Sequence, residues 1–105
     1  MTEAKIQREI VQLLRTIGFA VWETSQGYRR DPGGTRQTPG IADLLVIGHG
    51  RLMFVEVKAP KGKLRPSQEA FRDECIANSI GWHLWRDVMD AWAWAVAQDY
   101  IREAA

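Results

Sequence analysis

The strongest constraint on this sequence is a pair of apolar runs, residues 41–47 and 52–59, separated only by a Gly-His-Gly segment at 48–50. Two such runs joined by so short a connection are typical of antiparallel strands in a β-hairpin. A two-residue turn would consist of His49 and Gly50, and both residue types enter the left-handed backbone conformation that such turns need. The hairpin interpretation then fixes which residues of the two strands face each other.

The predicted register places two acidic side chains opposite each other. Counting back from the turn, Ile47 pairs with Leu52, and Asp43 pairs with Glu56. Directly opposed residues point to the same face, with Cβ atoms roughly 4.5–5.5 Å apart. Two carboxylates at that distance repel each other unless a cation lies between them, and Mg²⁺ or Mn²⁺ binds carboxylates together with water and phosphate oxygens. The hairpin therefore predicts a divalent metal site.

Lys58 lies two residues beyond Glu56 and hence on the same face of the strand. Its ammonium group would stand beside the metal, where it could hold an attacking water or stabilise charge developing on a phosphate. The flanking residues are apolar, and burying charge among them is costly without a function. Two alternatives stay open: an ordinary cross-strand Asp–Lys or Glu–Lys pair at a strand end, and a different turn length that shifts the register by one.

Positive charge is concentrated in the middle of the chain, although the net charge is only +1. Eight of the fourteen Lys and Arg residues lie between residues 29 and 65, where only three acids occur. A basic middle suits a polyanion such as nucleic acid, and a solvated basic surface is the alternative. The single cysteine, Cys75, excludes an internal disulfide, and no Cys/His cluster has zinc spacing. No signal peptide or transmembrane stretch is evident, so we expect a cytoplasmic protein.

The rest of the sequence predicts one α/β domain over residues 1–105. Apolar residues at three- and four-residue spacing favour a helix over 3–17 that ends at Gly18. The polar stretch 25–40, rich in Gly and Arg, indicates a long loop of the kind that often carries function. Further expected elements are strands at 19–23 and 82–85, a helix at 66–79 stopped by Gly81, and a helix at 88–103. The order αβββαβα gives a mixed sheet flanked by helices.

Residues 39–71 resemble the VRR-NUC branch of the PD-(D/E)XK nucleases. In that family an Asp preceded by Gly and Pro opens one strand, an E-x-K motif lies on the next, and a Gln follows at the start of a helix. Those positions are Asp43, Glu56, Lys58 and Gln68 here. The resemblance covers most of the chain and implies a restriction-endonuclease-like core in which these four residues are catalytic.

The resemblance also implies cofactors and partners. It implies hydrolysis of DNA phosphodiester bonds with Mg²⁺ or Mn²⁺, held by Asp43 and Glu56 and by the backbone carbonyl of Val57. Short members of the family resemble Holliday-junction resolvases and are expected to act as homodimers. One departure is Arg65, which stands where relatives often have a Ser helix cap. Because Arg is a poor N-cap, we expect this helix to fray at its start or to be capped by another group.

The first predicted helix offers a further acid to the site. Glu3 and Gln7 lie roughly 35° and 75° to one side of the centre of the apolar stripe. Both could therefore face the site, Glu3 as a metal ligand and Gln7 toward DNA. Glu9 lies roughly 85° to the other side and is a poorer candidate. A solvated helix face is the alternative for all three.

Basic side chains on both sides of the hairpin are the expected DNA contacts, because backbone phosphates bind cations regardless of base sequence. They are Arg29, Arg30 and Arg36 in the long loop, and Lys61, Lys63 and Arg65 after the E-x-K strand. Tyr28 either stacks on an exposed base or sugar or packs within its loop. Trp92 and Trp94 point about 160° apart on the last predicted helix, so one of them should face a partner subunit or lie under a loop.

These observations predict a metal-dependent DNA endonuclease without a membrane partner, and the family resemblance implies a homodimer similar to a Holliday-junction resolvase that acts on branched DNA. A flap, nicking or restriction-like nuclease with the same site is one alternative. A non-catalytic DNA-binding module of the same fold is another. An RNA nuclease also stays open, because the metal chemistry is indifferent to the 2′-hydroxyl group.

Overall fold

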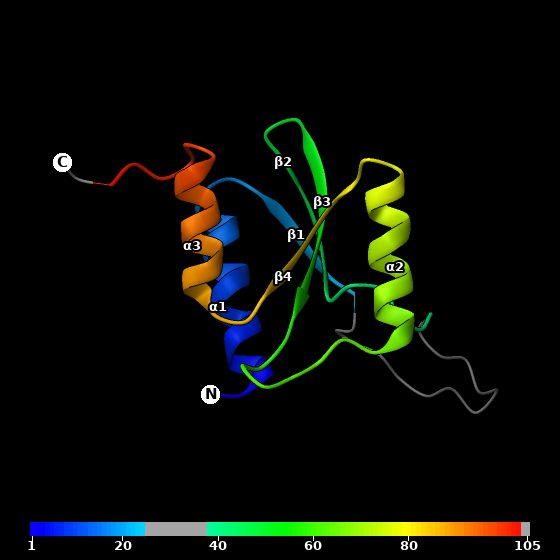
Figure 1. The fold of residues 1–105 in the computed structure, drawn as a ribbon. Coiled ribbons are helices and arrows are strands. Elements are labelled where there is room, and N and C mark those ends of the chain that lie inside the picture. Colours follow the sequence, from blue (N-terminus) through cyan, green and yellow to red (C-terminus); the bar gives the residue numbers. More distant parts are fainter. Residues whose placement is uncertain (25–37, 104–105) are drawn as a thin grey trace, which may run out of the picture.

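The computed structural model describes residues 1–24 and 38–103, and within them the order αβββαβα is confirmed. The elements are α1 (Glu3–Thr16), β1 (Ala20–Glu23), β2 (Leu44–Gly48), β3 (Arg51–Val57), α2 (Pro66–Ala77), β4 (Gly81–Trp85) and α3 (Val88–Ala97). Figure 1 shows one sheet between two helical layers, with α1 and α3 on one face and α2 on the other. None of the described helices is both long and apolar enough to cross a membrane.

The four strands are arranged in chain order, β1-β2-β3-β4. The first three pair antiparallel, whereas β4 pairs parallel to β3, so the sheet is mixed as predicted. The parallel pairing requires a crossover connection, which α2 provides by packing over the sheet on its way from β3 to β4. This crossover brings the end of β4 alongside the end of β3, where the E-x-K motif lies.

The predicted hairpin register is confirmed. Ile47 pairs with Leu52, and the turn residues His49 and Gly50 have φ values of 50° and 76°. Positive φ at both central residues is the geometry that lets a two-residue turn follow the twist of the strands. The last pair of the ladder joins Leu44 to Val55. The predicted strand start at residue 41 is therefore wrong, since β2 begins only after Asp43.

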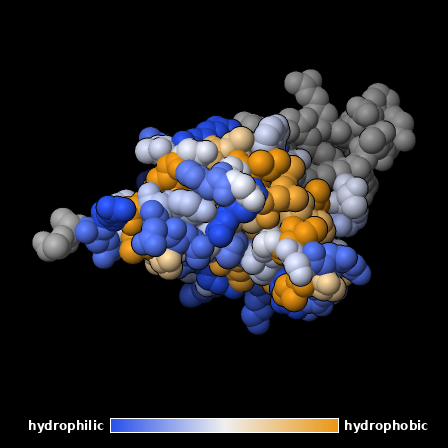
Figure 2. Space-filling view, turned by 90° about the horizontal axis from the view of Figure 1, so that it is seen from above, coloured by the Kyte–Doolittle hydropathy of each residue, from blue (hydrophilic) through white to orange (hydrophobic). Residues whose placement is uncertain are grey.

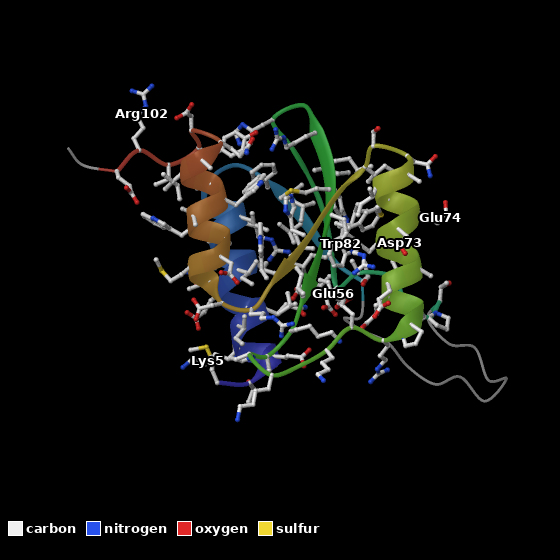
Figure 3. All side chains as sticks on the ribbon, viewed as in Figure 1. Lys5, Glu56, Asp73, Glu74, Trp82 and Arg102 are labelled. Carbon is white, nitrogen blue, oxygen red and sulfur yellow. The ribbon has the colours of Figure 1, made fainter. Side chains whose placement is uncertain are left out.

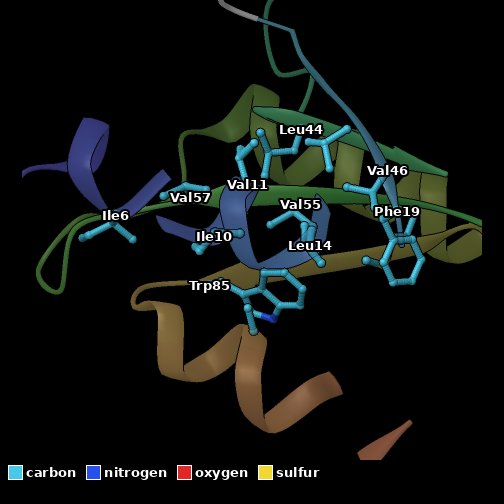
Figure 4. Close-up of a cluster of buried hydrophobic side chains, with 13 residues drawn as sticks. Ile6, Ile10, Val11, Leu14, Phe19, Leu44, Val46, Val55, Val57 and Trp85 are labelled. Carbon is cyan, nitrogen blue, oxygen red and sulfur yellow. The ribbon is translucent and has the colours of Figure 1, made fainter. Parts of the chain in front are cut away.

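The core lies between the sheet and the pair α1 and α3 (Figure 4). Ile6, Ile10 and Leu14, which follow one another at one-turn spacing on α1, are almost fully buried against strand residues such as Val55. Burying one such side chain stabilises the fold by about 1.5–3 kcal/mol. This packing fixes α1 along the sheet, so the polar residues at its start are held at the end of the sheet where β3 stops.

Two helices end earlier than the sequence pattern predicts. Helix α3 stops at Ala97 rather than at residue 103, because Asp99 adopts φ 65° and the N–H of Tyr100 returns to the carbonyl of Ala95 at 2.9 Å. Helix α2 stops at Ala77, and Ser79 rather than Gly81 takes the left-handed conformation, with φ 58°. Both closures are hydrogen-bonded C-caps made without glycine, so the usual glycine signal for a helix end is missing at both.

Candidate active site

Asp43 lies directly before β2, at the open end of the hairpin. Its carbonyl accepts a hydrogen bond from the N–H of Thr24 at 2.9 Å, which ties it to the end of β1. Its carboxylate Oδ2 accepts a hydrogen bond from the backbone N–H of Val57 at 2.8 Å. The carboxylate is therefore held against β3, at the strand that carries Glu56.

Gly40 brings the segment before Asp43 close to the start of α2. Gly40 has φ +90°, and a Cβ at this position would lie 2.2 Å from the carbonyl oxygen of Ser67. Any side chain there would push the two backbones apart. The Pro-Gly pair of the sequence motif thus sets the distance between Asp43 and the helix that carries Gln68.

Glu56, the second-last residue of β3, is buried, with only 2% of its surface exposed (Figure 3). Burial is the largest cause that raises the pKa of its carboxyl group to about 9, followed by hydrogen bonding and charge repulsion with Asp43. Lys58 acts in the opposite direction, and Glu3 adds a smaller repulsion. Glu56 Oε1 has no hydrogen-bond partner among the described residues. Such an unsatisfied buried acceptor requires an explanation, and a bound ion is one.

The donors at this end of the hairpin fit a divalent cation. Asp43 and Glu56 approach each other closely enough to raise the pKa of Glu56, and Glu56 Oε1 is buried without a hydrogen-bond partner among the described residues. Hard cations such as Mg²⁺ use one or two carboxylates with water and substrate oxygens. The described residues contain no group of three or more His, Cys, Asp or Glu side chains that could hold a metal. The site is thus a two-carboxylate site, and exposed Glu3 lies beside it without completing a cluster.

Lys58 is also buried, with 8% of its surface exposed. Its backbone N–H donates to the carbonyl of Trp85 at 3.2 Å, which continues the parallel pairing with β4 by one residue. The described residues contain no salt bridge to Lys58. The alternative of an ordinary cross-strand ion pair therefore has no support in the structure. The side chain of Lys58 is thus buried near the Glu56 carboxyl group and forms no ion pair with it.

Arg86 holds the turn that follows Lys58, a role that no sequence motif revealed. Its guanidinium group donates to the carbonyls of Ala59 at 2.9 Å and Gly62 at 2.6 Å. These contacts join the residue after β4 to the turn after β3, which are more than twenty residues apart in the chain. Arg86 is thus a positioning residue for the strand end that carries Lys58.

Gln68 lies in the first turn of α2, partly buried, and caps the helix. Its side-chain Oε1 accepts a hydrogen bond from the backbone N–H of Arg65 at 2.8 Å. The helix start is therefore capped by another group, as expected from the poor capping ability of Arg65. The amide nitrogen of Gln68 has no hydrogen bond within the described part of the chain, so two donors stay available.

The other predicted contact residues are placed as follows. Gln7 donates from Nε2 to Glu23 Oε1 at 3.1 Å, which makes Glu23 a neighbour of the site that the sequence interpretation missed. Lys61, Lys63 and Arg65 lie exposed between β3 and α2. Tyr28, Arg29, Arg30 and Arg36 fall outside the described residues. Trp94 packs against Phe19 and Trp85, whereas Trp92 has 37% of its surface exposed.

Comparison with known proteins finds a likeness in structure and none in sequence. No family model and no curated protein matches the sequence. A solved structure described as "VRR_NUC domain" matches with a TM-score of 0.70 at 20% sequence identity, over 94% of this chain and 97% of that one. The α/β architecture, with its mixed four-stranded sheet in the order αβββαβα, is accordingly that of a VRR-NUC domain.

Proposed function

We propose that this protein is a metal-dependent endonuclease that hydrolyses phosphodiester bonds in DNA. The observation that carries the proposal is the buried Glu56 carboxyl group, which faces Asp43 with one oxygen lacking a partner among the described residues, beside an ammonium group that forms no salt bridge there. A fold needs none of these features, and each costs stability. The likeness to a VRR_NUC domain supports the same function.

Each residue of the site has a separate task in this proposal. Asp43 and Glu56 hold the ion together with the Val57 carbonyl, and the N–H of Val57 keeps Asp43 oriented. When bound, Mg²⁺ or Mn²⁺ supplies a Lewis acid for a phosphoryl oxygen and lowers the pKa of water. The Lys58 ammonium group stabilises the negative charge that grows on the phosphate, at a buried position where charge interactions are strong. Gln68 orients a phosphate through its free amide donors.

DNA is the proposed substrate because the site is flanked by positive charge. Lys61, Lys63 and Arg65 lie exposed directly after the E-x-K strand. Phosphate contacts of this kind give affinity that depends on salt and not on base sequence. Branched DNA such as a four-way junction is the finer proposal, and it requires two active sites in one assembly.

A homodimer would supply the two sites, and an apolar surface supports it. Trp22, Ile47 and Leu52 are 53%, 43% and 43% exposed on the sheet, and Ile76 of α2 is 64% exposed. Ile47 pairs with Leu52 across the hairpin, so the side chains of these two residues are neighbours. Figure 2, which looks onto the hairpin end, shows apolar surface gathered right of centre on the side of α2. Exposed Trp92 on α3 is a second candidate for the contact.

Cleavage assays with Mn²⁺ on junction, flap and linear duplex DNA, and on an RNA duplex, test the enzyme proposal. Asp43→Ala and Lys58→Ala should abolish cleavage, whereas Asp73→Ala, an exposed acid on α2, should cleave as the native protein does. Symmetrical cuts across a junction support the resolvase proposal, and flap-only cleavage excludes it. Preference for the RNA duplex would contradict DNA as the substrate. Cleavage that survives both site substitutions would overturn the assignment of the site.

Sedimentation of the Ile47→Lys/Leu52→Lys double variant tests the dimer. Two ammonium groups on the apolar surface should convert a native dimer into a monomer, because burying unpaired charge at an interface costs several kcal/mol. Trp92→Lys is the matched variant for the α3 surface. If only Trp92→Lys yields a monomer, the contact lies on α3. A native protein that sediments as a monomer at assay concentration contradicts the dimer.

A further inference from the structure

A groove of about 460 Å³ lies between α1 and β1, beside the proposed active site. It is lined by Arg8, Val11, Gln12, Arg15, Thr16 and Glu23. Apart from Val11 at its base, every one of these side chains is polar, and two of them are guanidinium groups on successive parts of one helix face. Two guanidinium groups on one helix face favour a negatively charged partner in this groove.

The two arginines are available to an external anion. Arg15 donates from one terminal nitrogen to the carbonyl of Val21 at 2.9 Å, and this contact fixes the guanidinium group while leaving its other donors free. Arg8 is exposed. Neither arginine forms a salt bridge with any described acid. Because the guanidinium group of Arg15 is already held, it loses little conformational entropy when it binds a phosphate.

The groove leads to the proposed active site. Glu23, at one end, accepts a hydrogen bond from Gln7, and the next residue, Thr24, donates from its backbone to the carbonyl of Asp43. From Arg8 to Arg15 the helix rises about 10 Å. One strand of duplex DNA carries a charge every 3.4 Å along the axis, so this length matches about three nucleotide steps.

We propose that the groove between α1 and β1 binds the phosphates of the nucleic-acid strand that flanks the scissile bond, with Arg8 and Arg15 as the contacts. The proposal rests on the proposed nuclease function and extends the substrate path beyond Lys61, Lys63 and Arg65. The carboxylate of Glu23 is the one negative charge in the lining, and the two guanidinium groups outnumber it.

Binding of duplex DNA in Ca²⁺, without cleavage and over a range of salt concentrations, tests the groove. Arg8→Ala should reduce the slope of log K against log salt by about 0.9, the value of one phosphate contact. Between 50 and 200 mM salt, the variant should lose about three- to fourfold less affinity than the native protein loses. Arg15→Lys, which keeps the charge but not the fixed guanidinium geometry, should weaken binding with the slope retained. Arg102→Ala is the control, because Arg102 is not among the groove residues and lies at the end of the molecule away from Glu56 (Figure 3).

Three outcomes would overturn the proposal. One is an unchanged slope for Arg8→Ala. Another is an equal change for Arg102→Ala, which would reflect overall charge alone. Competition by a poly-glutamate chain as effective as that by DNA would show a general anion surface and would also overturn it. Failure of the groove is separable from failure of the nuclease proposal: native cleavage lost in Asp43→Ala with an unchanged Arg8→Ala slope removes only the groove.

Discussion

The two ends of the β2–β3 hairpin both contain polar and charged residues, but these residues differ in how far their side chains find partners. At the turn end, His49 Nε2 donates to the carbonyl of Ile17 at 2.8 Å, and its ring stacks on Tyr100 with centroids 4.4 Å apart. The guanidinium group of Arg51 lies over the Tyr100 ring, 5.7 Å from the centroid of that ring. His49 is thus hydrogen-bonded and stacked, Arg51 is held by cation–π contacts, and these contacts close the end of the fold.

At the open end, polar groups are buried and left incomplete. Glu56 has an oxygen without a partner among the described residues, and Lys58 has no salt bridge there. Buried polar groups normally acquire partners, so the exceptions call for a ligand. Both ends of the hairpin are polar, but at the structural end the side chains have partners, whereas at the proposed functional end a Glu56 oxygen and the Lys58 ammonium group lack them among the described residues.

The largest expected effect comes from removing the carboxyl group of Glu56. Without metal, the unfolded chain releases this proton near 4.5 while the folded protein keeps it up to a pKa of about 9. The folded state thus binds more protons over that range, so the free energy of unfolding falls as pH rises from 4.5 to about 9. Mn²⁺ displaces the proton and should stabilise the protein more at higher pH.

Glu56→Gln should abolish cleavage, the Mn²⁺ stabilisation and this part of the pH dependence together. Thermal unfolding with and without Mn²⁺ across the pH range measures the Mn²⁺ stabilisation and the pH dependence of stability. A cleavage assay measures the activity. Gln has nearly the same volume and no charge, so the metal-free variant should be at least as stable as the native protein at high pH. A native protein whose melting temperature does not respond to Mn²⁺ at any pH contradicts the metal site.

The sequence pattern was sufficient to predict the hairpin, because its signal is local. The turn His49-Gly50 sets the register, and the ladder ends at the pair Leu44–Val55, so Asp43 and Glu56 each adjoin its last pair. The start of β2 was missed because the Asp43 carboxylate takes the Val57 N–H, which strand propensities do not encode. Arg86 could not be found from the sequence, because its partners at Ala59 and Gly62 become neighbours only when β4 joins β3. Glu23 was missed because it meets Gln7 only when α1 packs beside β1.

A smaller effect is expected for Gln68, which serves both helix and site. Gln68→Ala should lower stability by roughly 0.3–1.5 kcal/mol through loss of the cap. Gln68→Glu keeps an acceptor for the Arg65 N–H but replaces the amide donors with a negative charge. Cleavage by Gln68→Glu should therefore fall about 10- to 100-fold, the cost of a lost hydrogen bond to a charged phosphate, while its melting temperature is retained. Native cleavage rates in Gln68→Glu would limit Gln68 to capping.

The smallest expected effect on cleavage belongs to the turn end, through His49→Asn. Asn also accepts a positive φ, so the turn is kept while the ring contacts with Tyr100 and Phe19 and the hydrogen bond to Ile17 are lost. These contacts contribute about 1–2 kcal/mol, and each kcal/mol lowers the melting temperature of a domain of this size by about 4–8 °C. Cleavage at a temperature well below unfolding should stay at the native rate. If His49→Asn instead reduced cleavage without lowering the melting temperature, the two ends of the hairpin would not divide structure from function as their hydrogen bonds indicate.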